Sequence, residues 1–472
     1  MVRAGERIHV IGIAGSGAAG TALLVARAGA VVDGCDLEAP SPYTAPLDAA
    51  GIPWVVGHDP AHLAGIERVA ITPALRAHPD LSELVAARAA GLPVVPWQAL
   101  LGELMADPAR LGLAVTGTHG KSTTTALLGH LLIDVGRDPT VEVGAFIADW
   151  GATVRAGAGA PFVVEADEFG DNFLQYHPAG VILTNVEMDH PDFFADRAAV
   201  LASFERFVRG MHPDERLGGC LLLAAAGDPG ADELIARLGD WPGTIERYGA
   251  GALGATDVAY AVDGTSFTLQ GQRFRMQLAG AHNVLNATAA LLLANRLGVP
   301  LGTLATSLRT FAGAGRRMEL IADTAGVTVY DDYAHHPTEV RAALAAARQN
   351  VGDRRLWAVF EPHMYSRTAL FLDEFAHSFT DADEVVIANI FASRDTDTSV
   401  TSAEVLADAI ERTSAIPAMA GGDVDATAQY VAEHLRAGDA VLVMGAGKSY
   451  RIARALAQAL ADGVLDRPRG VA

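Results

Sequence analysis

The feature that most constrains the fold is a glycine-rich turn between an apolar run and a helical pattern. Leu111 to Val115 are apolar enough to form a buried strand, and the sequence then reads TGTHGKSTTT. Beyond the turn, apolar residues recur at the three-to-four spacing of a helix: Leu128, Leu131, Leu132 and Val135. Small residues let backbone N–H groups face an anion at a helix N-terminus, Lys adds charge and Ser can ligate magnesium. The segment therefore predicts a strand, a phosphate-binding loop and a helix.

The loop differs from the usual phosphate-loop consensus at its first position. Val115 stands where G-x-x-x-x-G-K-[ST] begins with glycine, so the loop has the form T-G-T-x-G-K-S. A glycine turn with an unrelated surface lysine is the alternative, but the flanking strand and helix favour a nucleotide site. We expect the phosphates to contact a run of consecutive residues: Gly117, Thr118, His119, Gly120, Lys121, Ser122 and Thr123.

Charge and cysteine content narrow the class of protein. The 472 residues carry a net charge of −21, which argues against a nucleic-acid partner because such a partner needs a basic face. Two cysteines exclude a disulfide framework and fit a reducing compartment. The first apolar run enters a glycine loop, and no apolar run is long enough to span a bilayer. We therefore expect a cytoplasmic protein with no signal peptide and no membrane insertion.

Strand-like runs alternate with Ala- and Leu-rich helical patterns along the whole chain. This alternation predicts an α/β fold with helices covering parallel sheets. The length fits two to four domains. The points at which a strand and a glycine turn begin a new segment predict three domains, at residues 1–108, 109–314 and 315–472.

The first segment carries a second glycine motif. Gly15, Gly17 and Gly20 form G-x-G-x-x-G after the strand RIHVIGI, and a later strand ends at Asp36. This pattern is typical of dinucleotide binding, with the acid placed for a ribose hydroxyl. Any nucleoside diphosphate would satisfy the loop, so the motif does not separate NAD from a UDP-sugar, and a turn without a ligand is the third reading.

Acidic residues follow two further predicted strands of the central segment. Glu165, with Asp167 and Glu168, ends one strand, and Asp189 and His190 follow the next. Side chains at the carboxyl ends of parallel strands lie where α/β sheets bind ligands. One of these carboxylates could hold magnesium beside nucleotide phosphates, whereas a single His in such a place is more often a loop residue.

Polar residues also mark the start of a helix and the last domain. Asn283 and Asn286, beside His282, could either cap the helix or bind a nucleobase. Arg316 and Arg317 lie at the predicted domain boundary, where arginines reach phosphate across a cleft or form a solvated face. Two strand–helix loops follow, which hold Asp331, Asp332, Tyr333, His335 and His336, and then His363, Ser366 and Arg367. The terminal GAGKS, with Lys448, imitates a phosphate loop, but we interpret it as a turn.

Taken together, these segments resemble the Mur ligase family. The similarity is collinear over nearly the whole chain: GIAGSGAAG, GTHGKSTTT, EADE, TNVEMDH, HNVLNA, RR, DDYAHHPTE, PHMYSRT and VMGAG, in that order. The resemblance implies an N-terminal Rossmann-like UDP-binding domain, a central P-loop ATPase-like domain with a parallel sheet, and a C-terminal Rossmann-like domain that closes over ATP. It is nearest to the branch that adds L-alanine to the lactoyl carboxylate of UDP-N-acetylmuramate through an acyl phosphate, with ATP and magnesium, in peptidoglycan synthesis.

The resemblance also assigns roles to residues. Ser122, Glu165 and His190 would ligate magnesium, and the catalytic set would be Lys121, Glu165, His190, His335 and Arg367. ATP would contact the loop from Gly117 to Thr123 and also Asn283, Arg317 and Asp331. The UDP-substrate would contact Gly12, Gly15, Ser16, Gly17, Asp36, His282, Tyr333 and His336, and the amino-acid site would be lined by Tyr333, His335, His336 and Arg367.

One departure from the family pattern bears on the substrate. Met364 stands where the alanine-adding branch usually has a second basic residue in H-R-Y-T-R, and His363, Lys448 or another residue would have to compensate. Four alternatives stay open: a family member adding another amino acid, one adding a recycled peptide, an NAD-dependent oxidoreductase that uses GSGAAG, and a nucleotide-gated binding protein without ligase activity.

Overall fold

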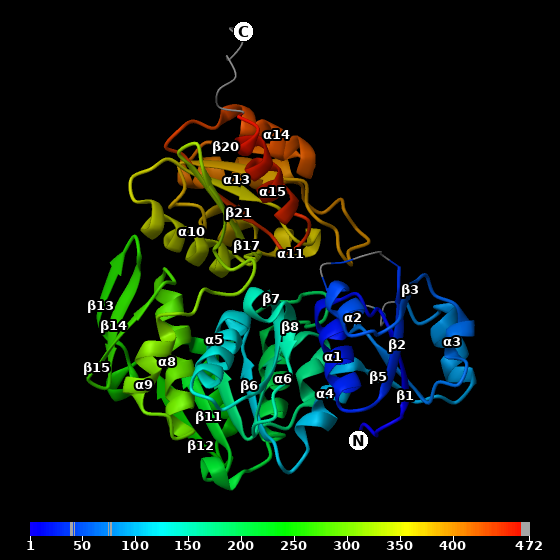
Figure 1. The fold of residues 1–472 in the computed structure, drawn as a ribbon. Coiled ribbons are helices and arrows are strands. Elements are labelled where there is room, and N and C mark those ends of the chain that lie inside the picture. Colours follow the sequence, from blue (N-terminus) through cyan, green and yellow to red (C-terminus); the bar gives the residue numbers. More distant parts are fainter. Residues whose placement is uncertain (38–40, 42, 74, 76–77, 464–472) are drawn as a thin grey trace.

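The N-terminal segment forms a parallel sheet that begins the chain (Figure 1). The computed structural model describes residues 1–37, 41, 43–73, 75 and 78–463. The sheet has the order β3-β2-β1-β4-β5, built from β1 (Arg7–Ile11), β2 (Val31–Asp36), β3 (Trp54–Val56), β4 (Arg68–Ile71) and β5 (Val94–Pro96). Its helical elements are α1 (Ser16–Arg27), α2 (Ala45–Ala49), η1 (Pro60–Leu63), α3 (Ser82–Ala89) and α4 (Trp97–Met105). This strand order is the one expected of a Rossmann-like sheet.

The central segment forms a larger sheet of order β12-β11-β10-β6-β9-β7-β8. Its strands are β6 (Leu111–Thr116), β7 (Thr140–Ile147), β8 (Ala152–Arg155), β9 (Pro161–Ala166), β10 (Gly180–Leu183), β11 (Leu221–Ala225) and β12 (Thr244–Tyr248). Its α-helices are α5 (Lys121–Asp134), α6 (Arg197–Arg209), α7 (Pro229–Leu238), α8 (Ala281–Arg296) and α9 (Leu301–Leu308). Short 3-10 turns lie at η3 (Ala148–Trp150), η4 (Phe169–Gln175), η5 (Glu215–Leu217) and η6 (Gly251–Leu253).

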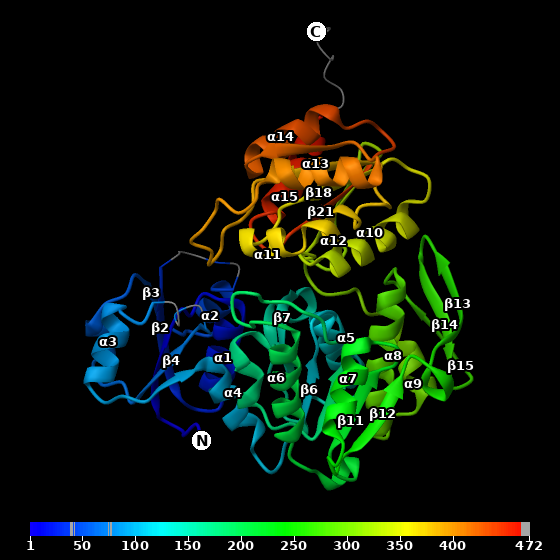
Figure 2. The ribbon, with the colours of Figure 1, turned by 180° about the vertical axis from the view of Figure 1, so that it is seen from behind.

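Helices cover both faces of this sheet, which explains the unbroken apolar runs of its strands. Every residue of β6 is buried. Leu113 and Val115 belong to the core shared with α5 and α8, while Ala114 faces the core shared with α6 and α7. In Figure 2, turned by 180°, α6 and α7 lie in front of the sheet, whereas α5 lies in front in Figure 1.

The last segment forms a sheet of order β16-β17-β21-β18-β19-β20, which lies at the top of both views (Figures 1 and 2). Its strands are β16 (Glu319–Thr324), β17 (Val327–Asp332), β18 (Leu356–Phe360), β19 (Glu384–Ala388), β20 (Ala418–Gly422) and β21 (Ala440–Met444). Its helices are α10 (Pro337–Val351), α11 (Tyr365–Leu370), α12 (Leu372–Ala376), α13 (Ala403–Ser414), α14 (Val424–His434) and α15 (Tyr450–Ala461).

The α/β class predicted from the sequence is confirmed, with differences at the sheet edges. β8 and β16 pair antiparallel to their neighbours, and β13 (Thr256–Ala261), β14 (Gly264–Leu269) and β15 (Gln272–Met276) form an antiparallel sheet that the sequence reading missed. Asp331 and Asp332 end β17 instead of lying in the following loop. The boundaries 108/109 and 314/315 fall between the sheets and stay a prediction.

Helix α4 packs against two domains at once. Leu100 belongs to the core of the N-terminal sheet, whereas Leu101 and Met105 belong to the core of the central sheet. Gly102 lies on the same helix, and a Cβ there would be 2.1 Å from the carbonyl oxygen of Gln175 in η4. The helix backbone therefore touches the central domain with no room for a methyl group.

We expect Gly102→Ala to lower the free energy of unfolding by about 1–3 kcal/mol, because the backbone of η4 would have to move. Gly302→Ala is the control, since Gly302 lies in α9 with its nearest neighbour 3.6 Å away. That change should be neutral or stabilise by up to about 1 kcal/mol. Urea unfolding of both variants tests the prediction, and equal effects would contradict it.

Candidate active site

A cavity of about 840 Å³ is lined by all three domains. Ser16 and Gly17 reach it from the N-terminal domain, and Trp97 lies beside them. From the central domain come Thr118, Gly120, Lys121, Ser122, Glu165 and His190. From the C-terminal domain come Arg317, Asp331, Tyr333, His335 and Arg367. Most of the residues expected to act on substrates therefore share one space.

The central strand order explains why these side chains meet. β6 has β9 on one side and β10 on the other, although β7 follows β6 in the chain. Ligands bind to open α/β sheets outside the carboxyl ends of strands where such an order reverses. The loop after β6, the acids after β9 and the DH motif after β10 consequently lie at one edge.

The phosphate loop is packed too tightly for larger residues at its glycines. Gly117 has φ +132°, and a Cβ there would be 2.1 Å from Oγ1 of Thr184. Gly120 has φ +82°, and its Cβ would be 2.8 Å from Oδ1 of Asn286. Asn286 thus supports the loop from α8. The N-cap of α8 is Gly280, without a side-chain cap, so the hypothesis that Asn283 or Asn286 caps the helix is wrong.

Lys121 lies at the mouth of the loop with its side chain 11% exposed, and it keeps its charge. Its Nζ lies 2.8 Å from Oε2 of Glu168 and 3.3 Å from Oδ1 of Asp167, and it donates to the carbonyl of Gly117 at 2.7 Å. Burial opposes the charged form, but the two carboxylates outweigh it and raise the pKa of Lys121. The ammonium group of Lys121 and the N-terminus of α5 therefore both favour a negatively charged ligand at the same place.

The donors beside Lys121 fit a magnesium ion. Ser122 donates from its hydroxyl to Oε1 of Glu165 at 2.9 Å, and the backbone N–H of Gly144 holds the other carboxylate oxygen at 2.6 Å. His190 lies near Asp167 and Glu168, and its Nδ1 is buried without a hydrogen-bond partner among the described residues. Oxygen-rich donors with room for waters and phosphate oxygens are what Mg²⁺ prefers.

An ion pair joins the central and C-terminal domains beside His190. Arg367 is 1% exposed, and its guanidinium meets Oδ1 of Asp189 through Nε at 2.9 Å and Nη2 at 2.8 Å. Burial opposes ionisation of Asp189, but His190 and Arg367 hold the pKa of its carboxyl well below the usual range. Both partners therefore stay charged in the cavity wall.

Two histidines of the C-terminal domain are neutral. Burial lowers the pKa of His335 to about 4 and that of His363 to about 2. The Nδ1 of His335 lies 3.0 Å from the carbonyl of Tyr333. Arg317 lies over the Tyr333 ring and donates to the hydroxyl of Ser122 at 3.1 Å. The C-terminal domain thus brings both a cation and a neutral imidazole to the phosphate loop.

Comparison with known proteins matches the three parts of the chain to three domains of one enzyme family. The chain matches the Mur ligase family catalytic domain over residues 7–108, the Mur ligase middle domain over 115–294, and the glutamate ligase domain of Mur ligases over 316–447. The chain belongs to the Mur ligase family. It is similar to curated UDP-N-acetylmuramate–L-alanine ligases of Kineococcus radiotolerans (41% identical, covering 93% of each chain) and Acidothermus cellulolyticus (38% identical, covering 93% of this chain and 92% of that one).

Solved structures of Mur ligases resemble this chain over nearly its full length. The UDP-N-acetylmuramate-alanine ligase of Thermotoga maritima is 26% identical, with a TM-score of 0.79, and the match covers 96% of this chain and 98% of that one. A murein peptide ligase from Psychrobacter arcticus is also 26% identical, with a TM-score of 0.68, covering 97% and 99%. The family resemblance inferred from the motifs is confirmed.

Several residues that were predicted for the site of this Mur ligase do not line the cavity. These are Gly12, Gly15, Asp36, Gly117, His119, Thr123, His282, Asn283 and His336. Asp36 accepts a hydrogen bond from the N–H of Ala14 at 2.9 Å and so fixes the N-terminal glycine loop. His336 is the N-cap of α10, where it accepts from the N–H of Thr338 while Glu339 accepts from the backbone of His336.

Arg394 and Glu142 are among the cavity residues that sequence reasoning missed. Arg394 lies in the loop after β19, pairs with Asp192 at 2.9 Å, and has Nη2 3.7 Å from the sulfur of Met364. Glu142 on β7 is 2% exposed, and burial, reinforced by Glu165, raises the pKa of its carboxyl well above the usual value. The sequence signal available for Arg394 was a polar loop that follows an apolar strand. Glu142 gave no such signal, because it is a single Glu within an apolar run.

The terminal GAGKS segment forms a turn, as predicted. The turn binds the carboxylate of Glu361 in its own domain, because the N–H of Ser449 donates to Oε2 of Glu361 at 2.7 Å. Lys448 is exposed, with Nζ 6.0 Å from the Phe391 ring centroid, and does not line the cavity. Lys448 therefore does not replace the basic residue absent at position 364, whereas Arg394 lies beside it.

His119 connects the phosphate loop to the C-terminal domain. Its ring lies between Glu187, at 3.3 Å, and Glu339 of α10, at 3.1 Å, and its centroid is 4.6 Å from that of the tilted His336 ring. Burial disfavours the charged ring, but the hydrogen bonds to both carboxylates outweigh it and raise the pKa of His119 to about 10. The imidazolium is thus part of the contact between the domains.

A pKa raised by folding means that the folded state binds the proton more tightly. The stabilisation from His119 should be complete below its usual pKa of 6.5 and be lost as the pH rises towards about 10. We expect the gap in thermal unfolding midpoint between the native protein and His119→Gln to shrink over that range. A gap that stays constant from pH 7 to pH 10 would contradict this.

Proposed function

We propose that this Mur ligase joins L-alanine to the lactoyl carboxylate of UDP-N-acetylmuramate, with ATP as the energy source and an acyl phosphate as the activated intermediate. The observation that carries the proposal is one cavity, lined by all three domains, that combines the phosphate loop and Lys121 of the central domain with the buried Arg367 of the C-terminal domain. The names of the curated relatives point to the same reaction.

The ATP end of the cavity is assigned to the central domain. The loop from Gly117 to Thr123 would hold the phosphates, with Asn283, Arg317 and Asp331 contributing from α8 and the C-terminal domain. Carboxylate and γ-phosphate are both anions, so fixed positive charge must bring them together. Lys121 and Arg317 supply that charge in a half-buried cavity wall, where its effect is stronger than in water.

We assign the magnesium site to Ser122, Glu165 and His190. A bound magnesium ion would neutralise phosphate charge and polarise the phosphoryl oxygens. Asp167 and Glu168 hold Lys121 next to this site and so fix its ammonium group.

The amino-acid end is assigned to the C-terminal domain. Arg367, fixed by Asp189, would bind the carboxylate of alanine, and Arg394 is the second guanidinium in place of the residue lost at Met364. His335 is neutral, and with Nδ1 directed to the carbonyl of Tyr333 its Nε2 is free to accept a proton from the incoming amine.

The UDP end is assigned to the N-terminal glycine loop. Gly12, Gly15, Ser16 and Gly17 would approach the diphosphate, and Asp36 keeps the loop in shape through Ala14. His282, Tyr333 and His336 complete the proposed substrate contacts. The cytoplasmic location expected from cysteine content stays a prediction; no helix in the described part of the chain has the length and hydropathy to cross a membrane.

Other readings of the motifs have less support. A nicotinamide-dependent oxidoreductase would leave the phosphate loop at Lys121 without a role. Addition of a preformed peptide is the nearer alternative, because one similar structure is a murein peptide ligase, but its TM-score of 0.68 is lower than the 0.79 of the alanine ligase.

The decisive test measures phosphate release from ATP in the presence of UDP-N-acetylmuramate and magnesium. The amine substrate is L-alanine, glycine, L-serine or a preformed tripeptide, each in turn. We expect turnover with L-alanine to exceed that with the others. Release of no phosphate with any amine would overturn the proposal, and preference for the tripeptide would move the protein to the peptide-adding branch.

Lys121→Ala tests the assignment of the central site in the same assay. Turnover should fall by about 10²-fold or more, because charge at the transferring phosphoryl group is lost. Binding of UDP-N-acetylmuramate, measured by calorimetry, should be mostly kept. Normal turnover would show that the central site is wrongly assigned.

Arg394→Ala tests the second guanidinium. A charge-assisted hydrogen bond contributes about 1.5–3 kcal/mol, so the KM for L-alanine should rise by roughly 10- to 150-fold while the KM for ATP changes little. Arg412→Ala, on the exposed side of α13, is the matched control and should leave both unchanged. An unchanged KM for alanine in Arg394→Ala would remove Arg394 from the amino-acid site.

A further inference from the structure

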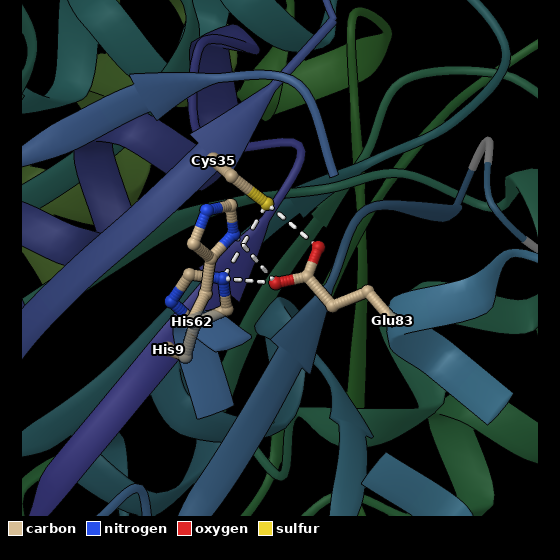
Figure 3. Close-up of side chains that lie close together, drawn as sticks. All are labelled: His9, Cys35, His62 and Glu83. Carbon is tan, nitrogen blue, oxygen red and sulfur yellow. Dashed lines mark hydrogen bonds and ion pairs between the residues drawn. The ribbon is translucent and has the colours of Figure 1, made fainter. Parts of the chain in front are cut away.

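A cluster of metal-ligand side chains lies in the N-terminal domain, apart from the cavity. His9 of β1, Cys35 of β2, His62 of η1 and Glu83 of α3 point toward one another, as Figure 3 shows. One donor atom from each lies within 4.8 Å of all the others. None of the four lines the active-site cavity.

The sheet register explains why two of these donors share a face. β1 and β2 pair in parallel, with His9 opposite Asp33 and Ile11 opposite Cys35. Side chains alternate along a strand, so His9, Asp33 and Cys35 point to the same side of the sheet. η1 and α3 cover that side, and they add His62 and Glu83.

The spacings are near those of a tetrahedral site. Nε2 of His9 is 3.4 Å from Sγ of Cys35 and 3.0 Å from Oε1 of Glu83, and Nδ1 of His62 is 3.1 Å from the same oxygen. Metal–ligand bonds of about 2.0–2.3 Å in a tetrahedron place ligand atoms about 3.3–3.7 Å apart. These three distances are therefore within a few tenths of an ångström of the tetrahedral spacing.

A partner outside the four donors orients His9 in the way metal sites do. Nδ1 of His9 lies 2.6 Å from Oδ1 of Asp33, which leaves Nε2 directed at the cluster. Metal-ligating histidines usually donate their other N–H to a carboxylate, which fixes the tautomer and strengthens the ligand. His58 adds a nearby imidazole, with Nδ1 3.1 Å from Cys35 Sγ.

Burial makes negative charge in this cluster costly in free energy unless a cation lies beside it. Cys35 and Glu83 are fully buried, and His9 is 2% exposed. Two carboxylates meet the ring of His9: Asp33 at 2.6 Å and Glu83 at 3.0 Å. Buried charges that are not paired are costly, and a divalent ion would place positive charge directly against the thiolate and the carboxylate that ligate it.

We propose that His9, Cys35, His62 and Glu83 form a structural binding site for one transition-metal ion of the zinc class. A sulfur, two imidazoles and a carboxylate suit zinc better than magnesium or calcium, which prefer oxygen. The ion joins β1, β2, η1 and α3. The carbonyl of Cys35 accepts hydrogen bonds from the N–H groups of Gly12 and Ile13, so the ion also stabilises the start of the N-terminal glycine loop.

The first test is the metal content of the full-length protein, purified without chelator and freed of any histidine tag. Elemental analysis should find about one zinc per chain. Cys35→Ala and Glu83→Gln should lose it, while Cys220→Ala, which removes the other cysteine, and His377→Ala, which changes an exposed histidine, should keep it.

Cobalt distinguishes this cluster from the active site. Cobalt added to the metal-free protein should give a sulfur-to-cobalt charge-transfer band, because only this cluster offers a cysteine among the candidate sites of the described residues. The band should persist in His190→Ala and Cys220→Ala and vanish in Cys35→Ala. Asp33→Asn should keep the band but weaken cobalt affinity by roughly 10- to 100-fold.

Two results would overturn the proposal. In the first, the native protein holds no metal and shows no saturable cobalt band. The cluster is then a proton-sharing network around an imidazolium at His9. Alternatively, the band would survive in Cys35→Ala. If Cys35→Ala does not fold, His62→Ala decides, since His62 is at the edge of the cluster with its side chain 25% exposed: unchanged affinity there would equally reject the site.

Discussion

The rest of the structure depends on the close packing of the phosphate loop against β10 and α8. Thr184 and Asn286 leave space only for hydrogen atoms at Gly117 and Gly120. Because the loop cannot move away from its supports, its lysine and the first turn of α5 have fixed positions. The acids after β9 then hold the ammonium of Lys121, and the charge of the site follows from that arrangement.

Polar contacts between the central and C-terminal domains complete the site. Arg367 reaches Asp189, Arg317 reaches Ser122, and Glu339 reaches His119. Each pair joins the central domain to the C-terminal domain and also faces or borders the cavity. The same interactions therefore hold the two domains together and place the cations that the proposed reaction needs.

Much of the fold was predictable because local patterns report it directly. The run from Leu111 to Val115 has no polar residue and is buried on both faces, and Pro337 begins α10 as its fixed φ favours. The sheet β13–β15 and the antiparallel edges β8 and β16 were missed, since pairing direction depends on partners that are distant in sequence. Arg394 was missed for the same reason: its place beside Met364 comes from folding, not from spacing.

The sequence by itself determined the family, the order of the α/β domains and the chemical types available to each site, because motif spacing and apolar periodicity are local properties. Only the tertiary structure decided which side chains meet. It placed Arg394, and not Lys448, beside Met364, and it brought His9, Cys35, His62 and Glu83 together from four separate elements. The physical reason is that strand order and register fix distances between residues far apart in the chain, and no local pattern encodes those distances.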